Sequence, residues 1–529
     1  MLPNKTMSID INKVNFYPPL IQDYLNGSLL KNGIVNWEYS KCELRSKIEN
    51  RSFSSDSRKL LVERLRIQNS GFVLTSQEED SLIALENEST LTITTGHQLT
   101  LLGGPLFFYS KILDVIKLCK EMTTSQNRII PVFWMASEDH DFEEISSVNL
   151  FGKKLSCPGE NKGPVGRIKS EYFNDFLNEV NVVLGDNERF NKIKTSITNS
   201  FKEGVNLAEI TRLLVRSLFA NEGLLIIDGD DLEFKKQLIP IFKQELFEEK
   251  AFKSSETQIS KIAQTYKVQV NPRKINLFYL EDELRVRIER VAGGFKTVDD
   301  QYSWSDEEMN DLIESKPEIV SPNVILRPVY QEIVLPNVAY VGGAGEIAYW
   351  LELANTFESF NIQFPLPVVR KSYFLIQEKL TEWLDTHELT IGQLFGDVDA
   401  LINKFTKSIS TDIISLDLEL TNICKFYEEL LLRGKAISPQ LEKVVLGEKK
   451  RAVSALRNLE KRFLNAEKQK HEVAITKIKN LIHKIFPNGS PMERVDSYFP
   501  FLVNPALDLK KEIENAGSVL DINISLIKY

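Results

Sequence analysis

A run of carboxylates around a single histidine is the segment best suited to catalysis. Residues 137–144 read SEDHDFEE, with five carboxylates and one imidazole in the last seven positions. They directly follow the apolar run 129–135, which has the length of a buried strand. Acidic neighbours favour the charged form of a histidine, which can then exchange protons near neutral pH. We therefore expect catalytic roles for Glu138, Asp139, His140 and Asp141.

Two other interpretations of this segment stay open. In the first, it is a solvated acidic loop in which Asp139 or Asp141 caps the following helix. In the second, its carboxylates bind a divalent metal, although the chain lacks the paired histidines of an H-x-x-x-H motif. We assign no residue as a metal ligand, and a metal requirement stays open.

Two glycine-containing turns are candidates for substrate binding. Segments 96–105 (GHQLTLLGGP) and 342–346 (GGAGE) each lie between a predicted strand and a predicted helix. Free amide groups and the helix dipole at such a position attract phosphate or carboxylate, and glycine lets a ligand approach the backbone. The first segment is neither a Walker loop nor GxGxxG, so an ordinary strand-to-helix turn is the alternative. The residues expected to bind substrate are Gly96, His97, Gln98, Gly103, Gly104, Gly342, Gly343, Gly345 and Glu346.

Three further polar residues are expected to bind substrate. Arg327 and Gln331 stand in the otherwise apolar stretch 327–350, and Arg370 follows the predicted strand 365–369. A guanidinium group offers a fork of donors to carboxylate or phosphate. The alternatives are a structural ion pair for Arg327 and an exposed strand end for Arg370.

The order of the predicted elements indicates one parallel sheet. Strand 91–95, helix 107–122 and strand 129–135 form a βαβ unit. The same alternation of strands and helices recurs later in the chain, so we predict an α/β fold with a Rossmann-like, doubly wound, mostly parallel sheet. The later elements are helix 206–223, strand 224–228, strand 338–341, helix 347–357 and strand 365–369.

Two inserts interrupt this sheet, and a helical hairpin follows it. Residues of about 150–205 are polar and mostly helical in pattern, and residues of about 252–330 are β-rich. From residue 398 apolar residues recur every three or four positions in two series, separated by breakers at 433–442. Two helices of roughly 40 residues each would form an antiparallel coiled-coil hairpin. The predicted domains are a core at 1–390, a hairpin at 391–486 and a segment at 487–529 that returns to the core.

Composition excludes several classes of protein. Charged residues make up 26% and hydrophobic residues 42% of the 529 positions, which is typical of a soluble globular protein. No two of the four cysteines form a C-x-x-C pair, which favours reduced thiols. No signal-peptide core and no membrane-spanning run is visible, so we expect a cytoplasmic protein without a membrane partner. The cysteines are Cys42, Cys119, Cys157 and Cys424.

The two hairpin arms differ in charge. Residues 394–432 hold three Lys and seven acids, whereas residues 433–485 hold fourteen Lys or Arg and five acids. The simpler interpretation is that the arms attract each other. The alternative is a non-enzymatic coiled-coil scaffold or nucleic-acid-associated protein that uses the basic arm 433–485, with steeply salt-dependent binding. Because the whole chain carries a net charge of −9, we do not expect a nucleic-acid partner.

The motifs in order resemble one known family. TGHQLTLLGGPLFFYSKI, PVFWMASEDHDFEEI and NVILRPVYQEIVLPNVAYVGGAGEIAYW, followed by the helical hairpin, are similar to the bacillithiol-biosynthesis cysteine-adding enzyme family over essentially the full length. The resemblance implies a ligase that joins cysteine to glucosaminyl-malate to form bacillithiol. It also implies a Rossmann core with two inserts and a coiled coil that forms a homodimer.

Amide formation from a free carboxylate and an amine is uphill in water, so this chemistry requires activation of the carboxylate. ATP or another adenine nucleotide is the simplest activator. In that mechanism Arg327 or Arg370 would hold an anion, and His140, flanked by Asp139 and Asp141, would take a proton from the amine. A nucleotide bound between the coiled coil and the core without turnover stays open as an alternative.

Overall fold

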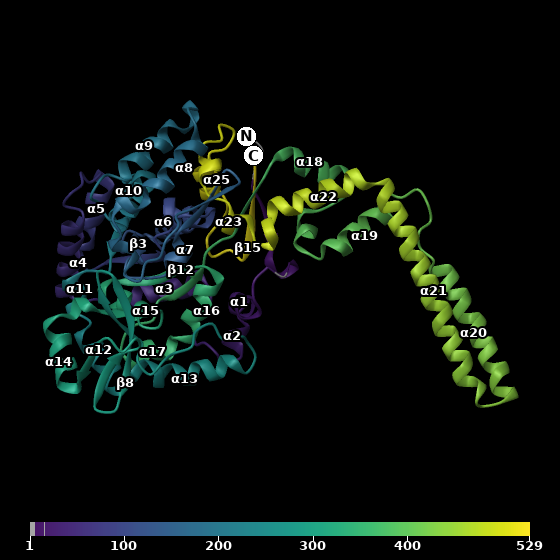
Figure 1. Ribbon diagram of the computed structural model, residues 1–529, viewed down its shortest axis with the longest axis horizontal. Coiled ribbons are helices and arrows are strands. Elements are labelled where there is room, and N and C mark those ends of the chain that lie inside the picture. Colours follow the sequence, from purple (N-terminus) through teal and green to yellow (C-terminus); the bar gives the residue numbers. More distant parts are fainter. Residues whose placement is uncertain (1–5, 15) are drawn as a thin grey trace. The chain divides into compact units, whose positions relative to one another are not determined.

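The computed structural model describes residues 6–14 and 16–529, which form two compact units (Figure 1). The first unit contains the chain up to Ile376 together with Pro491–Tyr529, and the second contains Gln377–Ser490. The boundary between them therefore falls at Gln377 instead of at residue 391. No helix among the described residues is long and apolar enough to cross a membrane.

Five parallel strands form the central sheet of the first unit. Their order is β13-β12-β2-β3-β6, so β2, the first of these strands in the chain, lies in the middle and later strands are added on both sides. This order confirms the predicted doubly wound sheet and places its topological switch between β2 and β12. The strands are β2 (Thr90–His97), β3 (Arg128–Met135), β6 (Leu225–Asp228), β12 (Asn337–Gly342) and β13 (Leu366–Val369).

The sequence of β2 explains its central position. Its β-branched residues suit a strand, and every residue of β2 except the last one, His97, is buried. The buried hydroxyls find partners on β12: Thr94 donates to the Asn337 side chain at 2.9 Å, and Thr95 donates to the Val341 carbonyl at 2.7 Å. A polar strand can therefore stand in the core because its hydroxyls are satisfied.

Helices connect these strands and pack on the sheet (Figure 1). The predicted helices are confirmed in position, with one difference. The helix expected at 347–357 is two helices, α16 and α17, joined at Leu353. The connecting helices are α6 (Leu106–Met122), α10 (Leu207–Phe219), α16 (Ala344–Glu352) and α17 (Ala354–Ser359). The N-terminal helices are α1 (Pro19–Leu25), α2 (Ser28–Lys31), α3 (Lys41–Asn50), α4 (Ser55–Gln68) and α5 (Ser76–Leu85).

The two inserts lie in the first unit. The first contains α8 (Asn174–Leu184) and α9 (Asn191–Ser200), and also a short hairpin that the polar pattern did not predict, β4 (Ser147–Leu150) with β5 (Lys153–Ser156). The second is β-rich as predicted, and its antiparallel sheet has the order β10-β9-β8-β7-β11. Its elements are α13 (Lys250–Ala263), β7 (Leu277–Glu281), β8 (Leu284–Val291), β9 (Gly294–Thr297), β10 (Ser303–Ser305), α14 (Asp306–Ser315) and β11 (Val320–Pro322).

A third sheet brings the two ends of the chain together. The C-terminal strand β15 (Asn523–Lys528) pairs with β1 (Thr6–Asp10) on one side and with β14 (Tyr373–Ile376) on the other. The segment before β15 supplies α23 (Met492–Val495), α24 (Phe499–Leu502) and α25 (Leu509–Glu514), of which α23 and α25 pack against α6. The C-terminal segment is therefore part of the first unit.

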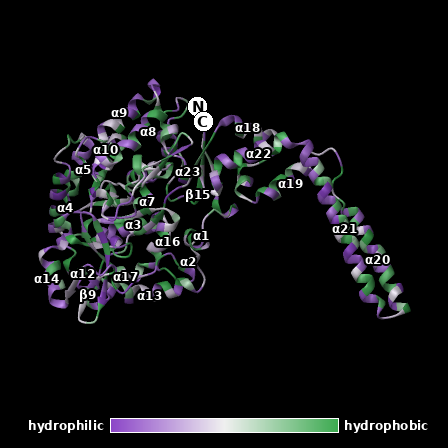
Figure 2. Cartoon of the chain, in the orientation of Figure 1, coloured by the Kyte–Doolittle hydropathy of each residue, from purple (hydrophilic) through white to green (hydrophobic). Residues whose placement is uncertain are grey.

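The second unit is helical, and its long hairpin consists of α20 (Asp417–Ile437) and α21 (Leu441–Lys470). Hydrophobic and hydrophilic residues alternate along both helices (Figure 2). The ion pair Lys449–Glu428 (3.1 Å) joins the two arms, as the opposite charges predicted. Lys435–Glu442 (2.8 Å), whose residues both belong to the predicted basic arm, joins α20 to α21 near the turn. The turn is shorter than predicted, because α20 continues through Gly434 to Ile437. The other helices are α18 (Glu378–Thr386), α19 (Val398–Ile409) and α22 (Glu472–Ile485).

The prediction of a continuous first arm is wrong. The apolar spacing runs through residue 413, yet α19 ends at Ile409 and α20 begins at Asp417, and Ile413 is 90% exposed. The Ser410 hydroxyl accepts a hydrogen bond from the backbone of Asp412, and the Ser415 hydroxyl accepts one from the backbone of Asp417. Such local bonds compete with helical hydrogen bonds and end the helix despite the apolar pattern.

Candidate active site

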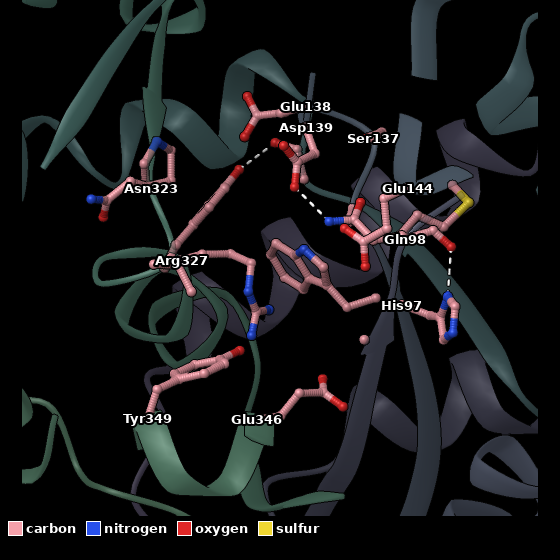
Figure 3. A pocket seen from close by; sticks show the side chains of 18 of the residues that line it. His97, Gln98, Ser137, Glu138, Asp139, Glu144, Asn323, Arg327, Glu346 and Tyr349 are labelled. Carbon is pink, nitrogen blue, oxygen red and sulfur yellow. Dashed lines mark hydrogen bonds between the residues drawn. The ribbon is translucent and has the colours of Figure 1, made fainter. Parts of the chain in front are cut away.

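A cavity of about 700 Å³ opens at the carboxyl ends of β2, β3 and β12, beside the topological switch. Ligands of open α/β sheets bind at this position. Side chains from both inserted and core segments line it (Figure 3). The charged lining residues are Lys111, Glu138, Asp139, Glu144, Arg273, Arg285, Arg287, Arg327, Glu346, Arg370 and Arg494.

Glu138 is the lining carboxylate whose environment best suits proton transfer. It follows β3, its side chain is 13% exposed, and one oxygen contacts the Nζ of Lys235 on α11 (Leu232–Lys236). Lys235 is fully buried and also donates to the Val320 carbonyl at 2.6 Å. Burial raises the pKa of Glu138 to about 7, and Lys235 limits the rise. This carboxyl group can therefore take up or release a proton near neutral pH.

Asp139 lies in the cavity wall but is held as a permanent anion. Its Oδ1 accepts the His140 backbone amide at 2.7 Å and lies 3.4 Å from Arg285, while its Oδ2 accepts the Gln98 side-chain amide at 2.5 Å. Burial alone would raise the pKa of Asp139, but these donors hold it well below its usual range. A carboxylate bound in this way is a poor proton carrier at neutral pH.

His140 and Asp141 are not among the residues that line the cavity. The Nδ1 of His140 lies 2.9 Å from Arg285 Nη1. Because arginine can only donate, that ring nitrogen accepts. Asp141 instead caps α7 (Phe142–Ile145) by accepting the Glu144 amide at 3.1 Å. For Asp141 the structure follows the capping alternative.

The first glycine turn divides into two parts. Gly96, His97 and Gln98 line the cavity, whereas Gly103 and Gly104 do not. The latter adopt φ values of 78° and 71°, and a Cβ there would lie 2.6 Å from Phe108 and 2.8 Å from Thr100, respectively. Packing and a left-handed backbone therefore require these two glycines, and the expectation that they bind substrate is not supported.

His97 is neutral at physiological pH. Its Nδ1 donates to the Gln98 carbonyl at 2.7 Å, and its ring packs against Phe107 and Phe108. Burial, together with the nearby positive charge of Lys111, lowers the pKa of His97 to about 4. His97 therefore contributes an uncharged imidazole ring to the cavity wall.

Arg327 presents an unused donor to the cavity. It lies at the first position of α15 (Arg327–Val334), its Nη1 donates to Gln331 at 3.2 Å, and its Nη2 is buried without a hydrogen-bond partner. Figure 3 shows its guanidinium pointing into the cavity beside Tyr349 and opposite Glu138. Among the described residues no acid pairs with it, so the alternative of a structural ion pair does not hold. A carboxylate or phosphate would complete its hydrogen bonding.

Gln331 lies behind Arg327 and does not line the cavity. It is fully buried, accepts from Arg327 and donates to Glu332 at 3.0 Å. Glu332 in turn accepts from Asn337 at 2.7 Å and lies 3.4 Å from Arg51. The predicted substrate contact for Gln331 is therefore replaced by a supporting contact that orients Arg327.

The second glycine turn forms a hydrogen bond with a side chain of the helix that follows it. Gly343 and Gly345 line the cavity, but the Gly343 amide donates to the Glu346 side chain at 2.8 Å at the start of α16. Glu346 also accepts from Lys111 at 2.6 Å and from the Tyr340 hydroxyl at 2.7 Å. The Gly343 amide is therefore not free for an anion, contrary to expectation, and Gly342 lies within β12 outside the lining.

Lys111 holds Glu346 in its ionised form. The lysine is buried and also donates to the Gly96 carbonyl at 2.7 Å. Although burial opposes the charge, Lys111 and three hydrogen bonds lower the pKa of Glu346 to about 2. This pair joins β2, α6 and α16 at the cavity floor.

The C-terminal segment completes the wall near Arg370. Arg370 donates to the buried Glu493 at 2.8 Å and stacks on the Phe107 ring at 4.8 Å. Glu493 also accepts the Tyr373 amide at 2.9 Å, and its neighbour Arg494 lines the cavity. Arg370 is buried, so the alternative of an exposed strand end is wrong.

Several lining residues had no local signal in the sequence. Lys111, Arg285 and Arg494 come from a helix, an inserted strand and the C-terminal segment, and only the tertiary fold brings them together. Tyr349 also faces the cavity (Figure 3). Among the described residues, no group of three or more His, Cys, Asp or Glu side chains is arranged to hold a metal ion.

Comparisons with known proteins identify the family. Residues 5–371 match the model of the bacillithiol biosynthesis BshC N-terminal Rossmann-like domain, and residues 373–529 match that of the BshC C-terminal coiled-coil domain. The chain is 38% identical to "Putative cysteine ligase BshC" of Flavobacterium psychrophilum and 36% identical to the protein of that name from Flavobacterium johnsoniae, with 99% of each chain covered. It is 26% identical to the Bacillus cereus protein, over 94% of this chain and 96% of that one. The chain therefore belongs to the bacillithiol biosynthesis BshC family, a family of ligases.

Proposed function

We propose that this chain joins the carboxyl group of cysteine to the amine of glucosaminyl-malate, which forms bacillithiol. The observation that carries the proposal is the cavity at the switch point, where Arg327 offers a free buried donor opposite Glu138. One group suits a substrate carboxylate and the other suits a substrate amine. Family membership supports the same chemistry.

The residues divide the reaction into binding and proton transfer. Arg327 binds a substrate carboxylate, and the Glu138 carboxylate removes a proton from the substrate ammonium group. The amine nitrogen then forms a bond to the activated carboxyl carbon of cysteine. The leaving group departs with the electron pair of the broken carbon–oxygen bond, and the nitrogen passes its second proton to that leaving group. Holding both substrates in one cavity provides much of the rate enhancement.

Carboxylate activation requires a co-substrate, for which we propose ATP or another adenine nucleotide. Arg273 and Arg494 both lie at the cavity lining. These guanidinium groups would hold phosphates. The nucleotide supplies the leaving group that makes the carboxyl carbon electrophilic.

Thiol analysis of cells tests the proposal directly. A strain that lacks this gene should contain no bacillithiol and should accumulate glucosaminyl-malate, and expression of the wild-type chain should restore bacillithiol. Normal bacillithiol in the deletion strain would contradict the proposed function.

The rate should depend on the ionisation of Glu138. Only the carboxylate can accept a proton, so activity should rise with pH through a pKa of about 7. Lys235→Met removes the cation that favours the carboxylate, so the rising limb should move to higher pH. Rates of bacillithiol formation between about pH 5 and 9 provide the measurement. Ionisation of the substrate affects the wild type and Lys235→Met equally. If the rising limb of the pH–rate profile lay at the same pH in both proteins, this assignment would be contradicted.

We also propose that the hairpin forms a homodimer. Large apolar side chains are exposed along it: Leu432 is 72% exposed and Ile437 is 78% exposed. Exposed apolar surface of this kind is typical of an interface. Leu432→Glu combined with Ile437→Glu should therefore give monomers in sedimentation analysis, whereas the wild type should sediment at twice the chain mass. Lys450→Glu, on α21, serves as a charge control. A wild-type monomer would contradict the proposal.

A further inference from the structure

The Gln98 side chain has one satisfied end and one unsatisfied end. Its Nε2 donates to Asp139 Oδ2 at 2.5 Å, while its Oε1 is buried in the cavity wall without a hydrogen-bond partner. Buried acceptors without partners are uncommon in folded proteins and call for an explanation. Figure 3 shows Gln98 beside Asp139, on the side of the cavity opposite Tyr349.

The chemistry of Asp139 determines which end of Gln98 faces the cavity. An ionised carboxylate can only accept hydrogen bonds, so the amide nitrogen of Gln98 must face Asp139 and its oxygen must face away. Asp139 is kept ionised by Arg285 and by the His140 amide. The low pKa of Asp139 agrees with this geometry. The orientation of the glutamine amide is therefore dictated by its neighbour.

Arg285 is itself fixed by the second insert. It lies on β8, its Nη2 donates to the Pro322 carbonyl at 3.1 Å, its Nε donates to Ser321 at 3.3 Å, and its guanidinium stacks on Phe278 at 4.1 Å. The insert therefore holds Arg285, which holds Asp139, which orients Gln98.

We propose that Arg285 and Asp139 position the Gln98 side-chain oxygen as the acceptor that recognises the primary amine of the substrate. The inference rests on the proposed function and adds a residue-level basis for substrate choice. Glu138 comes from the same loop as Asp139, so the amine would meet two acceptors on one wall. Gln98 orients the nitrogen, and Glu138 takes its proton. Asp139 is thus a positioning residue and not the base.

Direct binding tests this role without requiring turnover. Titration calorimetry on the purified full-length protein would compare glucosaminyl-malate with 2-deoxyglucosyl-malate, which lacks the amine, and with glucosyl-malate, which carries a hydroxyl in its place. The wild type should prefer the amine compound over the 2-deoxy compound by roughly 10- to 100-fold, because the acceptor would otherwise stay unpaired. It should also prefer the amine over the hydroxyl.

Two variants separate positioning from general damage. Gln98→Met removes the acceptor, and Asp139→Asn lets the new amide donate to Gln98 and turn its oxygen away from the cavity. Each should reduce the preference for the amine to about twofold or less. In the Gln98→Met background, Asp139→Asn should change the preference no further, since it acts through Gln98. Asp141→Asn, a neighbouring acid that only caps α7, should keep the wild-type preference.

The outcomes distinguish two failures. If the wild type binds no glucosaminyl-malate, the proposed function and this inference both fail. If the wild type prefers the amine but Gln98→Met and Asp139→Asn keep that preference, only the positioning role is overturned. Equal binding of glucosyl-malate would overturn the assignment of an amine to this acceptor.

Discussion

Glu138→Gln should lower the rate of bacillithiol formation by about 10²- to 10⁴-fold, which is the contribution typical of a general base. The amide keeps the size of the side chain but cannot accept the proton of the attacking amine. Glu138 is the expected base because its pKa lies at about 7 inside the cavity, whereas Asp139 is held ionised and His140 lies outside the lining.

The measurement should separate chemistry from binding and from folding. Dissociation constants for both substrates should change by less than about tenfold, since the loss acts on proton transfer. Glu143→Gln, an exposed acid of the same segment that does not line the cavity, is the matched control and should retain full activity. Thermal unfolding should be recorded because Lys235 loses its carboxylate partner. A folded Glu138→Gln protein with more than one tenth of the wild-type rate would exclude Glu138 as the base.

The sheet was predictable because its signals are local. The runs at 91–95 and 129–135 are apolar or β-branched, and helical spacing lies between them, so the βαβ unit follows from adjacent residues. The break at Ser410–Leu416 was not predicted. The spacing of apolar residues indicates which face of a helix is buried, but it does not reveal side chains that form hydrogen bonds with the nearby backbone and end the helix.

The candidate site was predictable only in part. Strand ends located Glu138, Asp139 and Gln98 correctly at the cavity, since parallel strands bring their carboxyl ends to one edge. Arg327 was found instead as a charged residue in an otherwise apolar stretch. The sequence could not show whether Gly103 and Gly104 bind a ligand or serve the fold. A backbone with positive φ and a close approach of a ligand both favour glycine. Gly343 donates to Glu346 of the same turn, and Arg370 donates to Glu493, which is distant in sequence. Only the structure shows that these two donors already have partners.

The environment of the acidic segment also depends on residues that are distant in sequence. His140 is flanked by carboxylates along the chain, which suggested a charged imidazole. In the fold Arg285 reaches its Nδ1 from β8, and the same arginine approaches Asp139. The contacts of this segment therefore could not be predicted from its neighbours along the chain.

Arg327→Met should weaken binding of the substrate whose carboxylate it holds by on the order of 10²-fold or more, because a buried charged hydrogen bond is lost. The dissociation constants of cysteine and of glucosaminyl-malate should be measured separately, and a rise in only one of them would identify the ligand. Arg327→Lys should recover only part of the loss, since an ammonium group lacks the planar fork of donors and cannot keep the Gln331 contact in the same geometry.

The effect should be distinct from that of a surface charge. Arg66→Met removes an exposed arginine that pairs with Glu79, and it should leave both dissociation constants unchanged. Moderate salt should weaken the Arg327 interaction little, because its Nη2 is buried and screened from mobile ions. If Arg327→Met binds both substrates with wild-type affinity, the free donor has no ligand among them. The cavity would then have to bind its anion through Arg273, Arg370 or Arg494, and Gln331 and Glu332 would support an arginine that serves the fold alone.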